Sequence, residues 1–60
     1  MKFPEFTQIG GGKVHLNPEQ ISEIQVQPNN TTLIWMANGR NHHVNDKVHE
    51  VLEKLGADPP

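Results

Sequence analysis

The spacing of apolar residues along the chain changes near residue 45. Before that point, short runs alternate between apolar and polar residues, which is typical of half-buried β-strands. After it, four apolar residues follow the i, i+3, i+4, i+7 spacing of one apolar stripe along a helix. These four are Val48, Val51, Leu52 and Leu55. The pattern predicts a small α+β protein: an antiparallel β-meander of four to five strands with one C-terminal α-helix packed on one face.

Residues that favour turns separate the predicted strands. The strand-like runs span 2–9, 13–16, 21–27, 31–37 and 40–44. Three glycines, an Asn-Pro pair and a Pro-Asn-Asn triplet lie between the first four runs, and all of these are turn-forming residues. Asn17 and Pro18 also predict a single helical turn over 17–20, which the Asn17 side chain would cap.

Asn38-Gly39, between the last two runs, is the strongest hairpin signal in the chain. A two-residue type I′ turn needs a positive φ at both central residues, and asparagine and glycine adopt that conformation more easily than other residues. We therefore predict a type I′ hairpin here.

The ends of the helix are marked by capping residues. Asn45 or Asp46 is expected to be the N-cap, and the charge of Asp46 suits the positive end of the helix dipole. Gly56 is expected to end the helix at the C′ position. Glu50 and Lys54 form an i, i+4 pair in the favourable order.

The strand that begins at Thr31 is apolar on both faces. Leu33 and Trp35 point to one side of the sheet, whereas Ile34 and Met36 point to the other. One helix covers about one face, and we expect it to cover the Ile34 side, because Val44 then points inward as well. The expected core consists of Val14, Leu16, Ile24, Val26, Ile34, Met36, Val44, Val48, Val51, Leu52 and Leu55.

This arrangement leaves Leu33 and Trp35 on the uncovered face, where Ile9 and Phe3 would extend an apolar patch. An exposed apolar patch usually marks an interaction site, and tryptophan is enriched among residues that dominate binding energy. The four residues are therefore the predicted partner interface. The alternative, that Trp35 simply completes the core, stays open at this point.

The small size of the chain also favours a partner. Sixty residues make one domain, which we expect to span 1–60, with an ordered core over about 5–56 and a tail over 57–60. A core of this size supplies at most about 3–5 kcal/mol of net stability. Disulfides and thiolate metal sites cannot add to it, because the chain has no cysteine. We therefore expect a homo-oligomer or a complex with another protein.

Charge and hydropathy narrow the class of partner. The net charge is −2, and the five Lys and Arg residues are scattered. Nucleic-acid binding is therefore not favoured, since its footprint is clustered basic charge. The longest apolar run, 33–37, is far shorter than the roughly 20 residues of a membrane-spanning helix. No signal sequence is recognisable, so we expect a cytoplasmic protein.

Histidines are the only residues with plausible site chemistry. His42 and His43 are adjacent in a strand, so they point to opposite faces and cannot bind one ion together. If the run 13–16 lay beside the run 40–44, His15 would neighbour one of them, but no zinc-like spacing completes a site. Neither a Ser-His-Asp nor a Cys-His arrangement is readable, and a small meander offers little concave pocket. We expect no catalysis, no cofactor and no metal.

The order of the motifs resembles a known family. LNPEQI (16–21), Asn38-Gly39, Val44 and VHEVLEKL (48–55) follow one another as in the small flagellar and swarming-motility proteins of the FlbD-like family. The resemblance covers about residues 6–55. It implies a non-enzymatic accessory role through protein contacts, such as contacts with the flagellar motor. The strand pattern is also similar to half of a LytTR-type DNA-binding domain, which the charge balance does not favour.

These observations predict a small, self-associating interaction module related to motility in a bacterium or phage. The alternative is a nucleic-acid-associated regulatory protein in which Trp35 stacks on bases while Arg40 and Lys13 contact phosphates. The two functions differ in salt dependence, because phosphate contacts weaken steeply with salt and an apolar protein interface does not.

Overall fold

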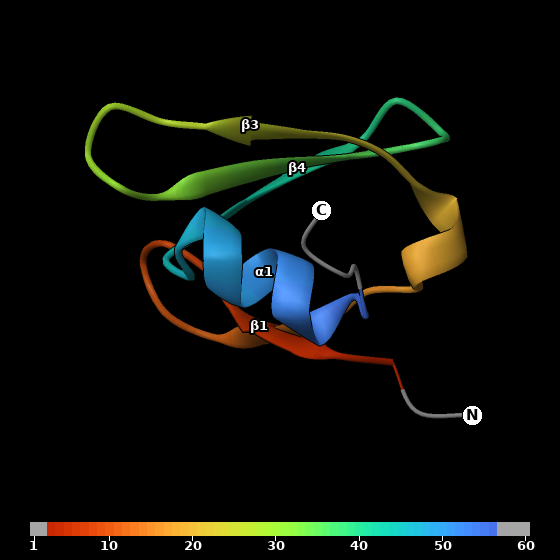
Figure 1. Cartoon of the computed structure of the whole chain (residues 1–60), viewed down its shortest axis with the longest axis horizontal. Helices are drawn as coiled ribbons and strands as arrows, with labels where there is room; N and C mark the ends of the chain where they lie inside the picture. Colours follow the sequence, from red (N-terminus) through yellow and green to blue (C-terminus); the bar gives the residue numbers. More distant parts are fainter. Residues whose placement is uncertain (1–2, 57–60) are drawn as a thin grey trace.

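The structure, a computed structural model, describes residues 3–56 and contains five strands and one α-helix (Figure 1). In chain order these are β1 (Glu5–Thr7), β2 (Lys13–His15), the 3-10 turn η1 (Pro18–Gln20), β3 (Ile21–Val26), β4 (Thr32–Met36), β5 (Asn41–Val44) and α1 (Val48–Lys54). The predicted α+β class is confirmed. The predicted tail over 57–60 lies outside the described residues. None of the helices in the described part is long and apolar enough to cross a membrane.

The strands form two antiparallel sheets that meet at one point. β1 pairs with β2, and β3, β4 and β5 pair in that order. An isolated antiparallel bridge joins Gln8, just after β1, to Val44 at the end of β5. On either side of it, the Ile9 N–H donates to the His43 carbonyl over 3.0 Å and the Asn45 N–H donates to the Thr7 carbonyl over 2.7 Å. The first strand therefore lies next to the last one.

Helix α1 lies between β1 and the three-stranded sheet (Figure 1). It covers the sheet face on which Ile34 and Val44 lie, because both are fully buried in one cluster with Val51 of the helix. The whole cluster consists of Phe6, Leu16, Ile34, Val44 and Val51, with Val14, Ile21, Ile24, Met36 and Leu55 packed against it. Val48 is half-buried. The core is thus built from both sheets and the helix.

The structure corrects two core predictions and adds a residue. Val26 is 61% exposed and Leu52 is 40% exposed, so both were wrongly assigned to the core. Val26 ends β3, an edge strand with a neighbour on one side only. Leu52 follows Val51 by about 100° around a helix of seven residues, and only Val51 is fully buried. Phe6 was missed, although it is completely buried and pairs with Val14.

A β-bulge in β3 sets which of its residues face the helix. Ile21 pairs with Met36 and Glu23 pairs with Trp35, so Ser22 is an extra residue without a partner of its own. The extra residue places Ile21 and Ile24 on the same face, although three positions separate them. Both therefore pack against the core.

The hairpin between β4 and β5 exists as predicted, but its turn type differs. The Met36 N–H donates to the Arg40 carbonyl over 2.7 Å and the Gly39 N–H donates to the Met36 carbonyl over 3.0 Å. Gly39 has φ +90°, whereas Asn38 is not among the residues of positive φ. The loop therefore has three residues, 37–39. They form a type I turn followed by a left-handed glycine, not a type I′ turn. The Asn38 side chain accepts the Arg40 N–H over 3.0 Å and favours this wider loop.

The loop between β3 and β4 has the same design. The Gln27 N–H donates to the Thr31 carbonyl over 2.9 Å, and the Asn30 N–H donates to the Gln27 carbonyl over 3.1 Å. Asn30, with φ +67°, takes the place that glycine has in the other loop. Matching three-residue loops thus hold both ends of β4.

The beginning of α1 also differs from the prediction. The N-cap is Lys47, not Asn45 or Asp46. Its backbone N–H donates to the Glu50 carboxylate over 3.0 Å, which is one half of a capping box, and the Lys47 side chain makes no capping hydrogen bond because it has no acceptor. At the other end, Leu55 is the C-cap and Gly56 follows with φ +78°, as predicted for the C′ position.

The loop geometry predicts opposite effects at two positions. Gly39→Val should lower the free energy of unfolding by about 1–2 kcal/mol, because a β-branched residue is strained at a left-handed φ. Asn30→Gly should leave it unchanged or raise it by up to about 1 kcal/mol, because glycine adopts that φ without strain. Urea titration of both variants measures this. Full stability of Gly39→Val would show that the turn is built differently.

The core assignment predicts a contrast between neighbouring helix residues. Val51→Ala should lower the free energy of unfolding by about 2 kcal/mol, a large share of the stability of so small a domain. Leu52→Ala should cost only about 1 kcal/mol, although it removes a larger side chain, because Leu52 is 40% exposed and Val51 is fully buried. Thermal unfolding of the two variants tests this, and a greater loss for Leu52→Ala would contradict the helix orientation.

Candidate functional site

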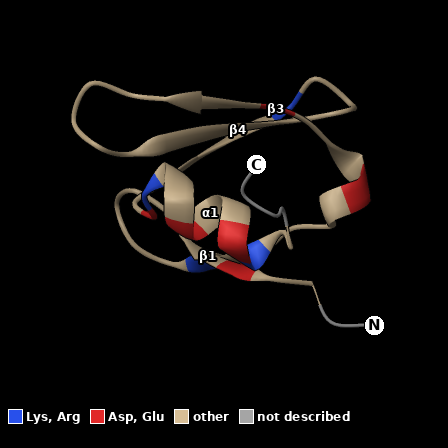
Figure 2. Ribbon diagram, viewed as in Figure 1, with Lys and Arg blue, Asp and Glu red and all other residues tan. Residues whose placement is uncertain are grey.

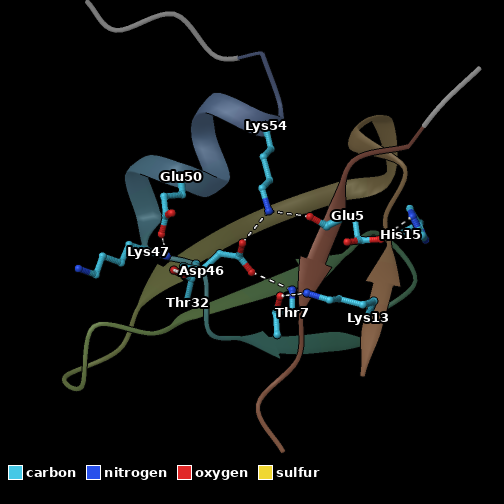
Figure 3. A network of polar contacts seen from close by, with 9 residues as sticks. All are labelled: Glu5, Thr7, Lys13, His15, Thr32, Asp46, Lys47, Glu50 and Lys54. Atoms are coloured by element: carbon cyan, nitrogen blue, oxygen red, sulfur yellow. Dashed lines mark hydrogen bonds and ion pairs between the residues drawn. The ribbon is translucent and has the colours of Figure 1, made fainter. Parts of the chain in front are cut away.

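Asp46, between β5 and α1, is the centre of a polar network that links distant parts of the chain (Figure 3). Its Oδ1 accepts the Thr7 N–H over 2.9 Å, and its Oδ2 accepts a hydrogen bond from Lys54 Nζ over 2.7 Å. Lys54 Nζ also donates to the Glu5 carbonyl over 2.7 Å. The Asp46 carbonyl accepts the Thr32 hydroxyl over 2.7 Å. One residue therefore connects β1, β4 and α1.

The charge of Asp46 is stabilised by its surroundings. Burial by itself would raise the pKa of its carboxyl group, since only 10% of the side chain is exposed. The hydrogen bond from Lys54, the hydrogen bond from the Thr7 N–H and the positive charge of Lys54 outweigh burial, so the pKa lies below its ordinary value. Asp46 is thus held as a carboxylate.

This network has the character of a structural tie. Lys54 Nζ is occupied by two oxygen atoms and lies 5.2 Å from the centre of the Phe6 ring, a cation–π distance. Within residues 3–56, every buried side-chain nitrogen and oxygen atom has a hydrogen-bond partner. The polar groups of the network are therefore used in holding the elements together.

The histidines do not converge. β1 lies between β2 and β5, so His15 in β2 is not beside His42 or His43 in β5, as a shared metal site would require. His15 lies opposite Glu5 instead, with 3.4 Å between His15 Nε2 and Glu5 Oε2. In the described part of the chain, no three residues of the metal-ligating types His, Cys, Asp and Glu gather into a site.

His43 instead joins a short chain of hydrogen bonds. Its Nε2 lies 2.6 Å from the Thr31 hydroxyl, which donates to the Asn29 Oδ1 over 2.6 Å. Because the hydroxyl hydrogen points to Asn29, Nε2 is the donor to Thr31. The imidazole is thereby fixed beside the start of β4.

The second candidate is the sheet face that α1 does not cover, which we call the outer surface. The register places Gln25, Leu33 and His43 in one row across the three strands, and Glu23, Trp35 and Asn41 in the next. Since directly paired residues share a face, all six lie on the side opposite Ile34. The outer surface therefore consists of a central apolar pair with polar flanks.

Leu33 and Trp35 form the centre of the outer surface. Both are half-buried, and the Trp35 indole N–H donates to Gln25 Oε1 over 3.3 Å. The indole ring therefore has a defined direction toward β3. A half-exposed tryptophan in the middle strand, with its polar edge satisfied, leaves an apolar ring available for contact.

Charged residues are scarce on the outer surface. Figure 2 shows that Lys, Arg, Asp and Glu lie mainly along α1, η1 and β1, whereas β4 has none. Glu23 is the one charged residue among the six that form the surface. The cores of protein–protein interfaces are likewise depleted of charge and enriched in aromatic residues.

The other two predicted interface residues have different positions. Ile9 is 46% exposed and lies beside His43, whose carbonyl accepts the Ile9 N–H, so it is placed at the edge of the outer surface. Phe3 is 39% exposed but precedes β1 at its opposite end, and nothing in the register joins it to Leu33. The flanking residues Glu23, Gln25, Asn41 and His43 were not predicted as surface partners, although hairpin register could have placed them there.

The fold is that of a small α+β protein whose helix leaves one charge-poor sheet face uncovered. The chain matches the FlbD family, described as flagellar and swarming motility proteins, over residues 5–58, and it belongs to that family. It is therefore a small motility-related protein, as the resemblance predicted. No curated protein and no solved structure shows a significant match to the chain.

The Asp46 network predicts a loss of stability in acid. Because the pKa of Asp46 is lower in the folded protein, its contribution is complete above the unfolded-state pKa near 4 and disappears as the pH falls through the folded value. Asp46→Asn should unfold at lower urea concentration than the native protein at pH 7, and this difference should shrink toward pH 3. Glu53→Gln, which removes an exposed carboxylate of α1, is the control and should keep the native midpoint at pH 7. An Asp46→Asn protein as stable as the native one at pH 7 would disprove the tie.

Proposed function

We propose that this protein is a non-enzymatic interaction module of the flagellar or swarming machinery, and that it binds another protein through the outer surface. The observation that carries the proposal is the position of Leu33 and Trp35 at the centre of a face that the chain's own helix does not cover. Membership of the FlbD family supports a role in motility, and the uncovered face supports binding to a protein as the way that role is carried out.

Interface physics supports this mode of action. Tryptophan is among the residues that most often dominate binding energy, and dominant residues cluster near the centre of an interface. Trp35 has that central position, while amides, an imidazole and one carboxylate surround it. Such a polar rim can exclude water from the central contact without adding a strong charge.

The character of the outer surface favours a protein partner over a nucleic acid. A surface that tracks phosphates needs Lys and Arg, and the six residues of this surface include neither. Arg40 and Lys13, which the nucleic-acid alternative requires, lie in the β4–β5 loop and in β2. We accordingly assign the protein a cytoplasmic, structural role at a protein contact rather than catalysis.

The proposal predicts that Trp35 is needed for motility but not for folding. Replacing the native gene by Trp35→Ser in the organism that encodes it should abolish or strongly reduce swarming. The purified variant should still unfold cooperatively, although its melting temperature should fall by about 5–10 °C because Trp35 is half-buried.

Leu52→Ser is the matched control, because it removes an exposed apolar side chain outside the outer surface. It should swarm as the native strain does. A folded, normally expressed Trp35→Ser protein that supports full swarming would refute the proposed function.

A further inference from the structure

β3 has an open edge. It pairs with β4 on one side, and in the part of the chain that the structure describes no strand lies on its other side (Figure 1). The backbone groups of successive residues in an antiparallel strand point alternately to its two sides. The Gln27 N–H donates to the Thr31 carbonyl and so points toward β4. The N–H and carbonyl groups of Ile24 and Val26 therefore point outward, away from β4.

The hydrogen bonds of β4 lead to the same result. The Met36 N–H donates to the Arg40 carbonyl, so the backbone groups of Met36 and, two residues earlier, of Ile34 point toward β5. Ile34 is the residue paired with Ile24, so Ile24 has no backbone hydrogen bond to β4. The edge of β3 therefore offers N–H donors and carbonyl acceptors to a further strand.

Two other strand edges are protected. In β1, the Thr7 N–H donates to Asp46 Oδ1, which takes the place of an acceptor on a neighbouring strand. The Glu5 carbonyl accepts a hydrogen bond from Lys54 Nζ, which takes the place of a donor. The free edge of β2 carries Lys13, and lysine at an edge discourages the addition of a strand. β3 has neither lysine nor a side chain bonded to its outward groups.

We propose that the open edge of β3 pairs in antiparallel fashion with the same edge of a second copy of this chain, around a two-fold axis perpendicular to the sheet. Gln25 lies at the axis, because the outward residues Ile24 and Val26 flank it symmetrically. Ile24 of each copy then exchanges both main-chain hydrogen bonds with Val26 of the other. The two three-stranded sheets become one continuous sheet. This inference goes beyond the proposed function, since it concerns an edge and not the outer surface.

The charges of β3 are complementary in this register. Glu23 of each copy lies opposite Gln27 of the other, and the amide N–H groups of glutamine are donors for a carboxylate. The two Glu23 side chains lie at opposite ends of the contact, so like charges do not face each other. An isologous contact of this kind is closed, because both copies use the same edge.

The length of the regular part of β3 also fits the two-fold axis. The β-bulge at Ser22 interrupts the strand at one end, and Pro28, which has no N–H, follows it at the other. In the proposed pairing, Ser22 of one copy lies opposite Pro28 of the other. Both interruptions therefore fall just outside the paired residues, 23–27.

Apolar contact adds to the hydrogen bonds of the edge. Ile24 and Val26 lie on the sheet face that carries Ile34, because Ile24 and Ile34 are directly paired. Val26, which is 61% exposed in the single chain, packs beside Ile24 of the second copy. Main-chain hydrogen bonds supply most of the affinity when a strand is added to a sheet edge. Since the contact is small, the dimer is weak and forms at high-micromolar to millimolar concentration.

Sedimentation equilibrium over that range tests the dimer. The native protein should shift from monomer to dimer with rising concentration. Trp35→Ser changes the outer surface and leaves the edge intact, so it should associate as the native protein does. A native protein that stays monomeric at millimolar concentration would overturn the dimer. A folded Trp35→Ser that stays monomeric would also overturn it, because association would then run through the sheet face. The swarming test of Trp35 is independent of these outcomes.

A proline tests the hydrogen bonds of the edge. Val26→Pro removes an outward N–H from each copy and no bond to β4, and proline is tolerated at such positions of edge strands. The folded variant should stay monomeric where the native protein dimerises. Val26→Thr is the matched control, because it keeps the N–H and the branched shape, and it should weaken association by about tenfold or less. A folded Val26→Pro that dimerises like the native protein would refute pairing through this edge.

Lysine substitutions test the register, and they decide the question if Val26→Pro does not fold. Gln27→Lys places an ammonium opposite Glu23 at both ends of the contact and should lower the dissociation constant about threefold to tenfold. Gln25→Lys brings two ammonium groups together at the axis and should raise it. Gln20→Lys, which adds the same charge at an exposed position in η1, should stay within about twofold of the native value. Tighter association of Gln25→Lys than of Gln27→Lys would refute the register, and equal effects of all three lysines would overturn the pairing of Glu23 with Gln27.

Discussion

The hydrogen bond and ion pair between Asp46 and Lys54 link the end of α1 to the start of the helix and to β1, around one small apolar cluster. Asp46 follows β5 directly, and through its side chain and its carbonyl it reaches β1, β4 and the end of α1. Lys54 then returns to β1 by its bond to the Glu5 carbonyl. The helix has seven residues and a single fully buried side chain, so apolar packing alone stabilises its contact with the sheet only weakly. The hydrogen bonds of Asp46 and Lys54 add to that packing and keep the helix on one face.

The outer surface depends on this arrangement, because the helix can cover only one side. β4 is the centre of the three-stranded sheet, and both of its faces are largely apolar. Once Ile34 is buried beneath the helix, the alternation of the strand leaves Leu33 and Trp35 on the other side. The same constraint that builds the core therefore creates the surface available for a partner.

Most of the fold was predictable from local patterns. Alternation predicted the strands, the 3.6-residue spacing predicted the helix, and Asn38-Gly39 predicted a hairpin. The turn type at Asn38-Gly39 was a local failure, since its loop has three residues rather than two. Other failures depended on non-local contacts. Lys47 became the N-cap because Asp46 is engaged with Thr7 and Lys54, partners 39 and 8 residues away. Phe6 became core because β1 pairs beside β5, a contact that no local pattern announces. The centre of the outer surface was predictable from one strand, whereas its flanks required the register of three.

The bridge between Gln8 and Val44 also has a consequence for how the chain folds. The strands β3, β4 and β5 form two tight hairpins, whose contacts close over short loops. The bridge joins residues 36 positions apart, from 8 to 44, and such closures are slow because chain entropy is lost before contacts are gained. Phe6 can be buried only after this step. During synthesis β1 must therefore wait until Val44 has been made, so the burial of Phe6 is expected to be a late step of folding.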